Sequence, residues 1–259
     1  MLGDIASLDL NPLLSAIKLS PNDKVVSIKE VGIADSNFIV VHLIKKIFQN
    51  NEKLCFINFH NSLTHYQIVG KKLGYDMSEK ISCGQAVVVD MLKMIEEKIY
   101  EEDYGFLENK KEFLENIFEC IEKRTNDLVQ KDSKHTYIII DDLSHLLDLG
   151  LSVEYMTRFI SWSCNLTSNN ISVVINNHVS SFEISGDLLP RDHILSNTLS
   201  YISDLEIEVS PLKTGRSNEV SGIINILRPG EKINKLHYKA FDRGIKTFKP
   251  GESLMYLLK

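Results

Sequence analysis

Hydrophobic and polar residues follow one pattern before about residue 200 and another after it. In the first part, short apolar runs alternate with longer stretches in which apolar residues recur at helical spacing. The pattern predicts strands at 24–30, 53–59, 136–140 and 171–176, a further short apolar run at 86–92, and helices at 37–49, 62–73, 106–130, 143–149 and 153–166. Nearly continuous apolar strands separated by helices are typical of a buried parallel sheet.

After residue 200 the long helical stretches stop. The pattern predicts strands at 205–209, 220–227, 235–241 and 245–248, with glycine and proline marking the turns between them. A parallel core followed by an antiparallel meander is the layout of RecA-like ATPase domains. We therefore predict an α/β fold of the RecA-like P-loop NTPase type, with a mostly parallel central sheet and C-terminal antiparallel strands, as a single domain over residues 1–259.

The first predicted strand, loop and helix form the setting of a phosphate-binding P-loop. In G-x-x-x-x-G-K-[ST], the second glycine lets backbone amides surround the phosphates, the lysine neutralises them, and the hydroxyl ligates magnesium. Counting from Gly32, these three positions hold Asn37, Phe38 and Ile39. Asp35 adds a negative charge at the helix N-terminus, where a phosphate would otherwise be favoured. The sequence thus predicts a degenerate P-loop on a scaffold that does not hydrolyse NTP.

The strand that ends at Asp141 has the form of a Walker B strand, whose carboxylate holds magnesium through water in an ATPase. A strand-end aspartate is also common in other α/β proteins because it caps the following helix, and Asp142 or Ser144 could cap residues 143–149. RecA-like ATPases place a water-activating glutamate after the next strand, but residues 58–61 are Asn-Phe-His-Asn. We therefore favour a structural role for Asp141 and predict neither a catalytic residue nor a nucleotide site.

The charge is unevenly distributed along the chain. The net charge of −6 argues against a protein that coats nucleic acid through bulk positive charge. Residues 211–259 nevertheless carry ten Lys and Arg against four Asp and Glu, or +6, which leaves −12 for residues 1–210. This asymmetry indicates either a localised anion-binding face or solvated charges on edge strands.

Candidate RNA contacts lie in two polar segments. Residues 176–195 follow a predicted central strand, and in RecA-like rings the loop at this point faces the central channel and touches nucleic acid. Arg191 and His193 are candidates there, as are Lys213 and Arg216 in a later turn. The alternative is a set of solvated loops that carry a few charges.

We predict no metal site and no cofactor. His60 and His65 are five residues apart, so they do not share a helix face as the two histidines of H-E-x-x-H do. The four cysteines form no C-x-x-C pair, which favours free thiols in a reducing, intracellular compartment: Cys55, Cys83, Cys120 and Cys164. No apolar run approaches the roughly 18 residues of a membrane span, so no membrane association is expected.

Several segments resemble the animal members of the Elongator complex protein 6 family. They are 37–42 (NFIVVH), 53–56 (KLCF), 63–74 (LTHYQIVGKKLG) and 140–150 (IDDLSHLLDLG). The resemblance covers about the first 150 residues well, and the remainder resembles the family in length and strand order. In the 63–74 block, we expect Tyr66 and Val69 to face the sheet and Gly74 to end the helix as a left-handed cap.

The resemblance implies a non-catalytic, ATPase-like subunit. The family joins Elongator subunits 4 and 5, which are also RecA-like, in a heterohexameric ring of two copies each. This ring docks on the catalytic subcomplex and binds tRNA during modification of the wobble uridine at carbon 5, and the radical and acetyl-transfer chemistry belongs to subunit 3. The resemblance also implies a location in the cytoplasm and nucleus.

Two other hypotheses stay open at this point. The first is an active ATPase of the RecA or KaiC type with an unorthodox loop, which predicts magnesium-dependent ATP binding that is lost on Asp141→Ala. The second is a DNA-binding adaptor of the recombinase-paralogue type, which predicts a preference for single-stranded DNA over tRNA.

Overall fold

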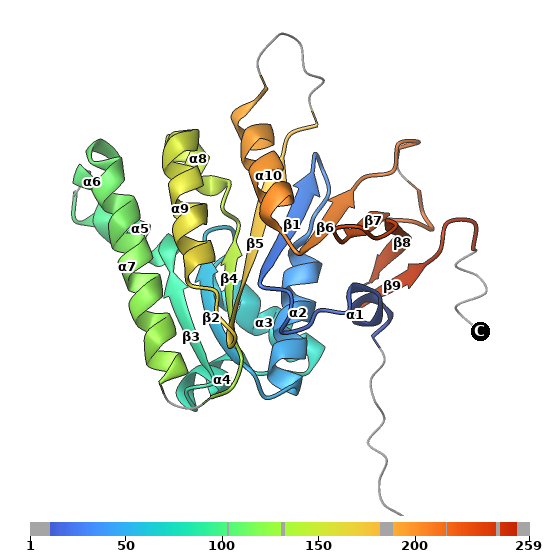
Figure 1. The fold of residues 1–259 in the computed structure, drawn as a ribbon, viewed down its shortest axis with the longest axis horizontal. Coiled ribbons are helices and arrows are strands. Elements are labelled where there is room, and N and C mark those ends of the chain that lie inside the picture. The colour runs from blue at the N-terminus through green and yellow to red at the C-terminus, as the bar shows by residue number, and fades with distance from the viewer. Residues whose placement is uncertain are drawn as a thin grey trace, which may run out of the picture.

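The computed structural model describes residues 11–102, 104–130, 133–181, 189–215, 217–241 and 244–252. Within these residues, nine strands form one sheet in the order β3-β2-β4-β5-β1-β6-β7-β8-β9 (Figure 1). The strands are β1 (Val25–Val31), β2 (Lys53–Asn58), β3 (Ala86–Asp90), β4 (Thr136–Asp141), β5 (Ile171–Val179), β6 (Leu205–Ser210), β7 (Gly222–Leu227), β8 (Asn234–Phe241) and β9 (Gly244–Phe248). Strands β1 to β6 pair in parallel, and β6 to β9 form an antiparallel meander. The predicted sheet architecture is therefore confirmed.

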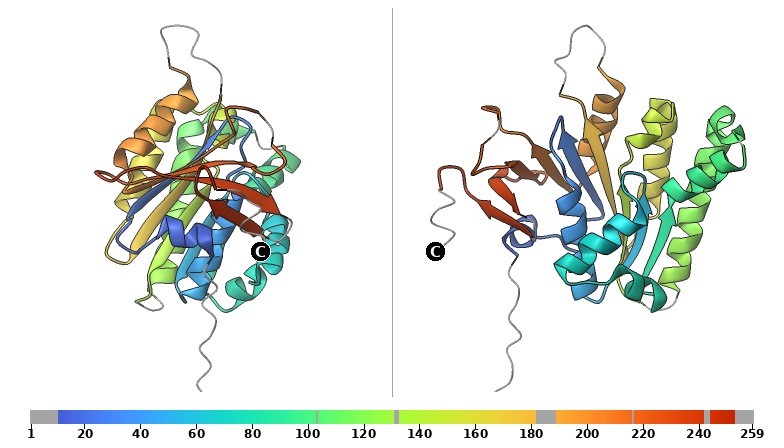
Figure 2. Two further views of the ribbon diagram at one scale, coloured as in Figure 1. Left: turned by 90° about the vertical axis from the view of Figure 1, so that its right-hand side faces the viewer. Right: turned by 180° about the vertical axis from the view of Figure 1, so that it is seen from behind.

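Helices cover the two faces of the sheet as separate layers (Figures 1 and 2). One face packs against α1 (Pro12–Ile17), α2 (Asn37–Gln49), α3 (Leu63–Leu73) and α4 (Met77–Ser82). The other packs against α7 (Lys110–Val129), α9 (Val153–Asn165) and α10 (Arg191–Ile202). Shorter helices complete the described residues: α5 (Met91–Tyr100), α6 (Gly105–Glu108) and α8 (His145–Asp148). Every helix among the residues described is too short or too polar to span a bilayer.

The sequence pattern missed four helices, α1, α4, α5 and α10. Arg191 and His193 lie in the first turn of α10, so the prediction that they lie on a loop was wrong. The buried positions of α10 are few, namely Leu195, Ser196 and Leu199, so the sequence shows little helical periodicity here. Packing against β5, β1 and α9 therefore stabilises a helix that the hydrophobic pattern of the sequence does not predict.

Helix α3 carries the 63–74 block, and its packing explains the unusual composition. Tyr66 is fully buried with its ring edge-on to Phe56, at 4.6 Å between centroids, and the half-buried Val69 packs against the same core. Gly74 ends the helix with φ of +90°, which is the left-handed cap predicted. Gly70 is buried where a Cβ would come within 2.6 Å of the Tyr75 ring. The block is thus a packing motif.

We expect Gly70→Ala to lower the free energy of unfolding by about 1–3 kcal/mol, because the added methyl must displace a buried tyrosine ring. Gly74→Ala is the matched control. It also adds one methyl group, but nothing lies within 4 Å of that Cβ, so only the left-handed backbone resists it, at about 1 kcal/mol. Denaturant unfolding of both variants measures the difference. Equal losses would show that the contact with Tyr75 is unimportant.

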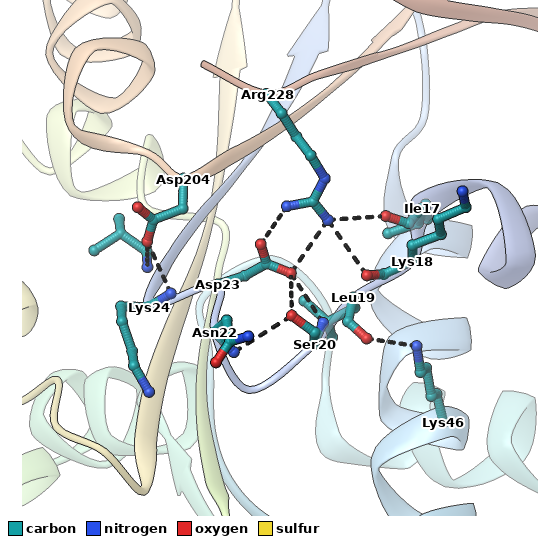
Figure 3. A network of polar contacts seen from close by, with 11 residues as sticks. Ile17, Lys18, Leu19, Ser20, Asn22, Asp23, Lys24, Lys46, Asp204 and Arg228 are labelled. Carbon is teal, nitrogen blue, oxygen red and sulfur yellow. Dashed lines mark hydrogen bonds and ion pairs between the residues drawn. The ribbon is translucent and has the colours of Figure 1, made fainter. Parts of the chain in front are cut away.

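The connection between α1 and β1 is fixed to the meander by a partly buried ion pair (Figure 3). The guanidinium of Arg228, at the end of β7, donates to both carboxylate oxygens of Asp23. Its Nη2 also donates to the carbonyl oxygens of Ile17 and Lys18, at 3.2 and 3.3 Å. The hydrogen bonds to Asp23 raise the pKa of Arg228, so the guanidinium stays charged. The N-terminal segment and the meander are therefore joined by groups more than 200 residues apart.

Candidate functional site

The loop between β1 and α2 occupies the place of a P-loop and is bonded to the neighbouring strand β5. Gly32 has φ of +62°, its N–H donates to the Val179 carbonyl at 2.8 Å, and its own carbonyl accepts a hydrogen bond from His178 Nε2 at 2.8 Å. A Cβ at Gly32 would lie 2.8 Å from the Ser181 Cβ. The loop is therefore held against β5 and the residues that follow it.

Two amides at the start of α2, those of the N-cap Ser36 and of Asn37, are already bonded to carboxylates of the chain. The N–H of Ser36 donates to Glu30 Oε2 at 2.6 Å, and the N–H of Asn37 donates to Asp35 Oδ1 at 2.8 Å. Free amides at this point of a P-loop protein bind phosphate. Here a phosphate would have to displace two carboxylates and would be repelled by their charge. The sequence analysis identified Asp35 but missed Glu30, because its carboxylate reaches the helix only through the fold of the loop.

Apolar packing occupies the two positions at which a P-loop has its lysine and hydroxyl. The ring of Phe38 packs against the ring of Tyr238 on β8, with centroids 4.7 Å apart. Ile39 is fully buried in the core beneath α2. Neither side chain can neutralise a phosphate or ligate magnesium, so the loop lacks the lysine and the hydroxyl of a P-loop.

Asp141 lies at the end of β4 and is fully buried. The Tyr66 hydroxyl donates to its Oδ2, and Asn176 Nδ2 donates to its Oδ1 at 2.6 Å. Burial raises the pKa of Asp141, although these two hydrogen bonds oppose the shift. Because both oxygens are bonded to protein side chains and the group is closed to solvent, the geometry favours the structural role over a magnesium site.

Asp142 and Ser144 fix the chain beyond β4. Asp142 Oδ1 accepts a hydrogen bond from the Ser144 N–H at 2.9 Å, and Ser144 Oγ accepts one from the His178 N–H on β5 at 2.8 Å. Burial, together with the charges of Asp141 and Glu30, raises the pKa of Asp142 to about 7. The helix expected at 143–149 is a single turn, α8, and Ser144 precedes it without a side-chain capping bond.

A pair of histidines at the same edge of the sheet was missed by the sequence analysis. His60 Nδ1 and His145 Nε2 are 2.9 Å apart, and His145 Nδ1 lies 3.3 Å from the Asp148 carboxylate. His60 stands after β2, where an ATPase has its glutamate. The two residues are far apart in sequence and meet because β2 and β4 pair in parallel. Across the described part of the chain, no group of three His, Cys, Asp or Glu side chains is arranged to hold a metal ion.

A cavity of about 700 Å³ opens beside the loop, between α2, α3 and the meander. Its walls are largely apolar, with Phe38, Val41, Val69 and Tyr238 among them. The imidazole of His42 on this wall donates from Nδ1 to the Phe38 carbonyl at 2.6 Å, and burial lowers its pKa. Such walls suit apolar contact better than the polyphosphate of a nucleotide.

The predicted RNA contacts lie on the surface. Arg191 is exposed at the start of α10, Lys213 is exposed in the turn after β6, and Arg216 lies outside the described residues. His193 Nε2 lies 3.1 Å from the Ser180 carbonyl oxygen. Arg191 and Lys213 follow the carboxyl ends of β5 and β6, at the same edge as the degenerate loop. No contact between the two is present in the part of the chain that the structure describes.

These features define a RecA-type scaffold in which carboxylates and aromatic packing replace the phosphate site. The fold is that of KaiC-like proteins: the crystal structure of a KaiC-like protein from the archaeon Pyrococcus horikoshii superposes with a TM-score of 0.55, covering 87% of this chain and 90% of that one at 10% identity.

Sequence comparison gives the particular family. The profile described as Elongation complex protein 6 matches residues 8–243, and the chain belongs to this family. It is 29% identical to human Elongator complex protein 6, over 85% of this chain and 88% of that protein. The mouse protein is 26% identical, covering 95% and 97%, and the Dictyostelium discoideum protein is 21% identical, covering 97% and 96%. The resemblance found in the first 150 residues therefore extends over most of the chain, and the family assignment is confirmed.

Proposed function

We propose that this protein is a non-catalytic subunit of an Elongator complex. The observation that carries the proposal is the bonding of the Ser36 and Asn37 amides to Glu30 and Asp35, which fills the phosphate position of a RecA-type scaffold with the chain's own carboxylates. Family membership gives the complex in which such a subunit would serve. The scaffold then acts through its surfaces and does not hydrolyse a nucleotide.

The proposal includes three further elements. The protein joins subunits 4 and 5 in a heterohexameric ring of two copies each, the ring docks on the catalytic subcomplex, and it binds tRNA in support of wobble-uridine modification at carbon 5. RecA-type domains commonly assemble through their flanks, and obligate interfaces of this kind are large and apolar. Exposed apolar residues of this chain, such as Ile33 at 81% exposure on the loop, fit that expectation.

Light scattering after size exclusion tests the assembly. We expect a stable particle with the mass of two copies of each subunit only when this chain is co-expressed with subunits 4 and 5. The chain alone should give neither that particle nor a homohexamer. A well-behaved monomer or homohexamer that ignores both subunits would overturn the ring.

Calorimetric titration with magnesium and ATP tests the absence of a nucleotide site. We expect no binding by the chain alone at millimolar ATP, because the P-loop lysine is missing and the Ser36 and Asn37 amides are bonded to carboxylates. Asp141→Ala separates this proposal from the ATPase alternative: the alternative requires ATP binding in the wild type that this substitution abolishes, whereas our proposal requires no ATP binding in either protein.

Competition between single-stranded DNA and tRNA for the ring tests the DNA-adaptor alternative.

A further inference from the structure

The face of the meander opposite the α1 and α2 core carries cations and aromatic rings from two strands. Leu236 and Tyr238 of β8 are buried in the core beside α1 and α2. Because side chains alternate along a strand, the other face of β8 carries Lys235, His237 and Lys239. On β9, Lys246 lies opposite Lys239 and Phe248 lies opposite His237, so both share this face. We call these five residues the outer meander face.

The helical layer on this side of the sheet ends before the meander begins. The apolar cluster beneath α7, α9 and α10 includes no described residue of β6 to β9. The meander extends beyond α10 in Figure 1, and the turned views agree (Figure 2). Lys235 is exposed, His237, Lys239 and Lys246 are half-buried, and Phe248 is buried. The outer meander face is therefore open over its lysines.

The two lysines of β8 carry positive charge that no described acid pairs with. Within the described residues, neither Lys235 nor Lys239 forms an ion pair. The acidic residue on the same row of the sheet is Glu208, which is separated from Lys235 by Asn225. That carboxylate already pairs with Lys29 at 3.2 Å and accepts a hydrogen bond from Asn225 at 2.9 Å. The lysines of β8 thus present uncompensated charge.

We propose that the outer meander face is a contact surface for the phosphate backbone of RNA, an inference that rests on the proposed role in tRNA binding. Alternate residues of a strand repeat about every 7 Å, so Lys235 and Lys239 flank His237 at regular intervals. The ring of His237 stands edge-on to Phe248, with centroids 5.7 Å apart, and can stack with an unpaired base. This order of cation, ring and cation fits RNA better than an acidic peptide, which offers no bases to stack.

The inference differs from the contacts expected at Arg191, Lys213 and Arg216. Arg191 and Lys213 follow the carboxyl ends of parallel strands, whereas the outer meander face lies on the antiparallel extension of the sheet. Only the pairing of β8 with β9 brings Lys239 beside Lys246. Part of the positive charge after residue 210 therefore lies together on one face of the meander.

Fluorescence anisotropy with labelled tRNA, over a series of salt concentrations, tests the inference on the ring with subunits 4 and 5. The variant Lys235→Glu/Lys239→Glu should weaken binding at least about 10-fold and reduce the slope of log affinity against log salt by about 1.4, the value for two phosphate contacts. Lys235→Arg/Lys239→Arg should retain both affinity and slope. The matched control, Lys111→Glu/Lys123→Glu on α7, makes the same change of charge near the opposite end of the sheet and should change affinity less than about twofold.

Each outcome is decisive. Equal affinity and equal salt slope in the variant and the α7 control would overturn the inference while leaving the ring intact. Loss of the variant from the ring would also overturn it, by showing that this face binds a protein. If the wild-type ring does not form, the proposed function fails, and the same comparison on this chain alone decides whether the face binds RNA.

Discussion

Replacing Arg228 by alanine should lower the free energy of unfolding by about 3 kcal/mol, because it leaves the Asp23 carboxylate buried without its counter-charge. The Asp23 side chain is only 5% exposed, and Arg228 is 21% exposed. The substitution also removes the hydrogen bonds to the Ile17 and Lys18 carbonyls, so the segment before β1 loses its attachment to β7 (Figure 3). For a chain of this length the loss corresponds to a Tm lower by roughly 6–12 °C, measured by calorimetry.

A surface ion pair provides the control for this prediction. Arg158 and Glu154 pair at 2.8 Å on α9, with side chains 54% and 71% exposed, so Arg158→Ala should cost well under about 1 kcal/mol. The double variant Asp23→Ala/Arg228→Ala should lose less than the sum of the single losses, since removing both partners leaves no buried charge. Strict additivity would contradict an interaction between the two groups.

Replacing Asp142 by asparagine should stabilise the protein at neutral and higher pH. The pKa of Asp142 rises from its ordinary value of 3.8 to about 7 on folding, chiefly because of burial. The folded state therefore binds more protons than the unfolded state between about pH 4 and pH 7, and the free energy of unfolding falls as pH rises through this range. Asparagine does not titrate, and its amide oxygen can still accept the hydrogen bond from the Ser144 N–H.

The measurement is denaturant unfolding of both proteins from pH 4 to pH 8. Asp142→Asn and the wild type should be equally stable near pH 4, and the variant should exceed the wild type by up to about 4 kcal/mol at pH 8. Asp127→Asn on α7 is the control because it makes the same substitution at an exposed side chain, and it should change the free energy of unfolding by less than about 1 kcal/mol at pH 8. Parallel stability curves for Asp142→Asn and the wild type would show that the carboxyl group does not titrate differently in the folded state.

Local features of the sequence were enough to predict the sheet and the missing lysine and hydroxyl of the P-loop. Continuous apolar runs define buried strands because each residue of such a strand meets a helix layer, and β1, β2, β4 and β5 fall where the runs predict them. The degenerate P-loop is equally local: Asn37, Phe38 and Ile39 stand at fixed distances from Gly32, and a missing lysine needs no three-dimensional information.

Only the tertiary structure decided which side chains surround the degenerate P-loop. Glu30 reaches the Ser36 amide only because the loop folds back, and His60 meets His145 only because β2 and β4 are neighbours. Helix α10 forms through contacts with β5, β1 and α9 and not through its own periodicity.

The sequence by itself thus determined the class of fold, the family and the absence of P-loop cations, all of which depend on residue type and local spacing. The structure decided which amides are occupied, which carboxylates are buried and which lysines of the meander share a face. Those properties depend on strand register and on contacts between residues far apart in the chain, such as Asp23 and Arg228, and register and distant contacts are set by the packing of the whole sheet.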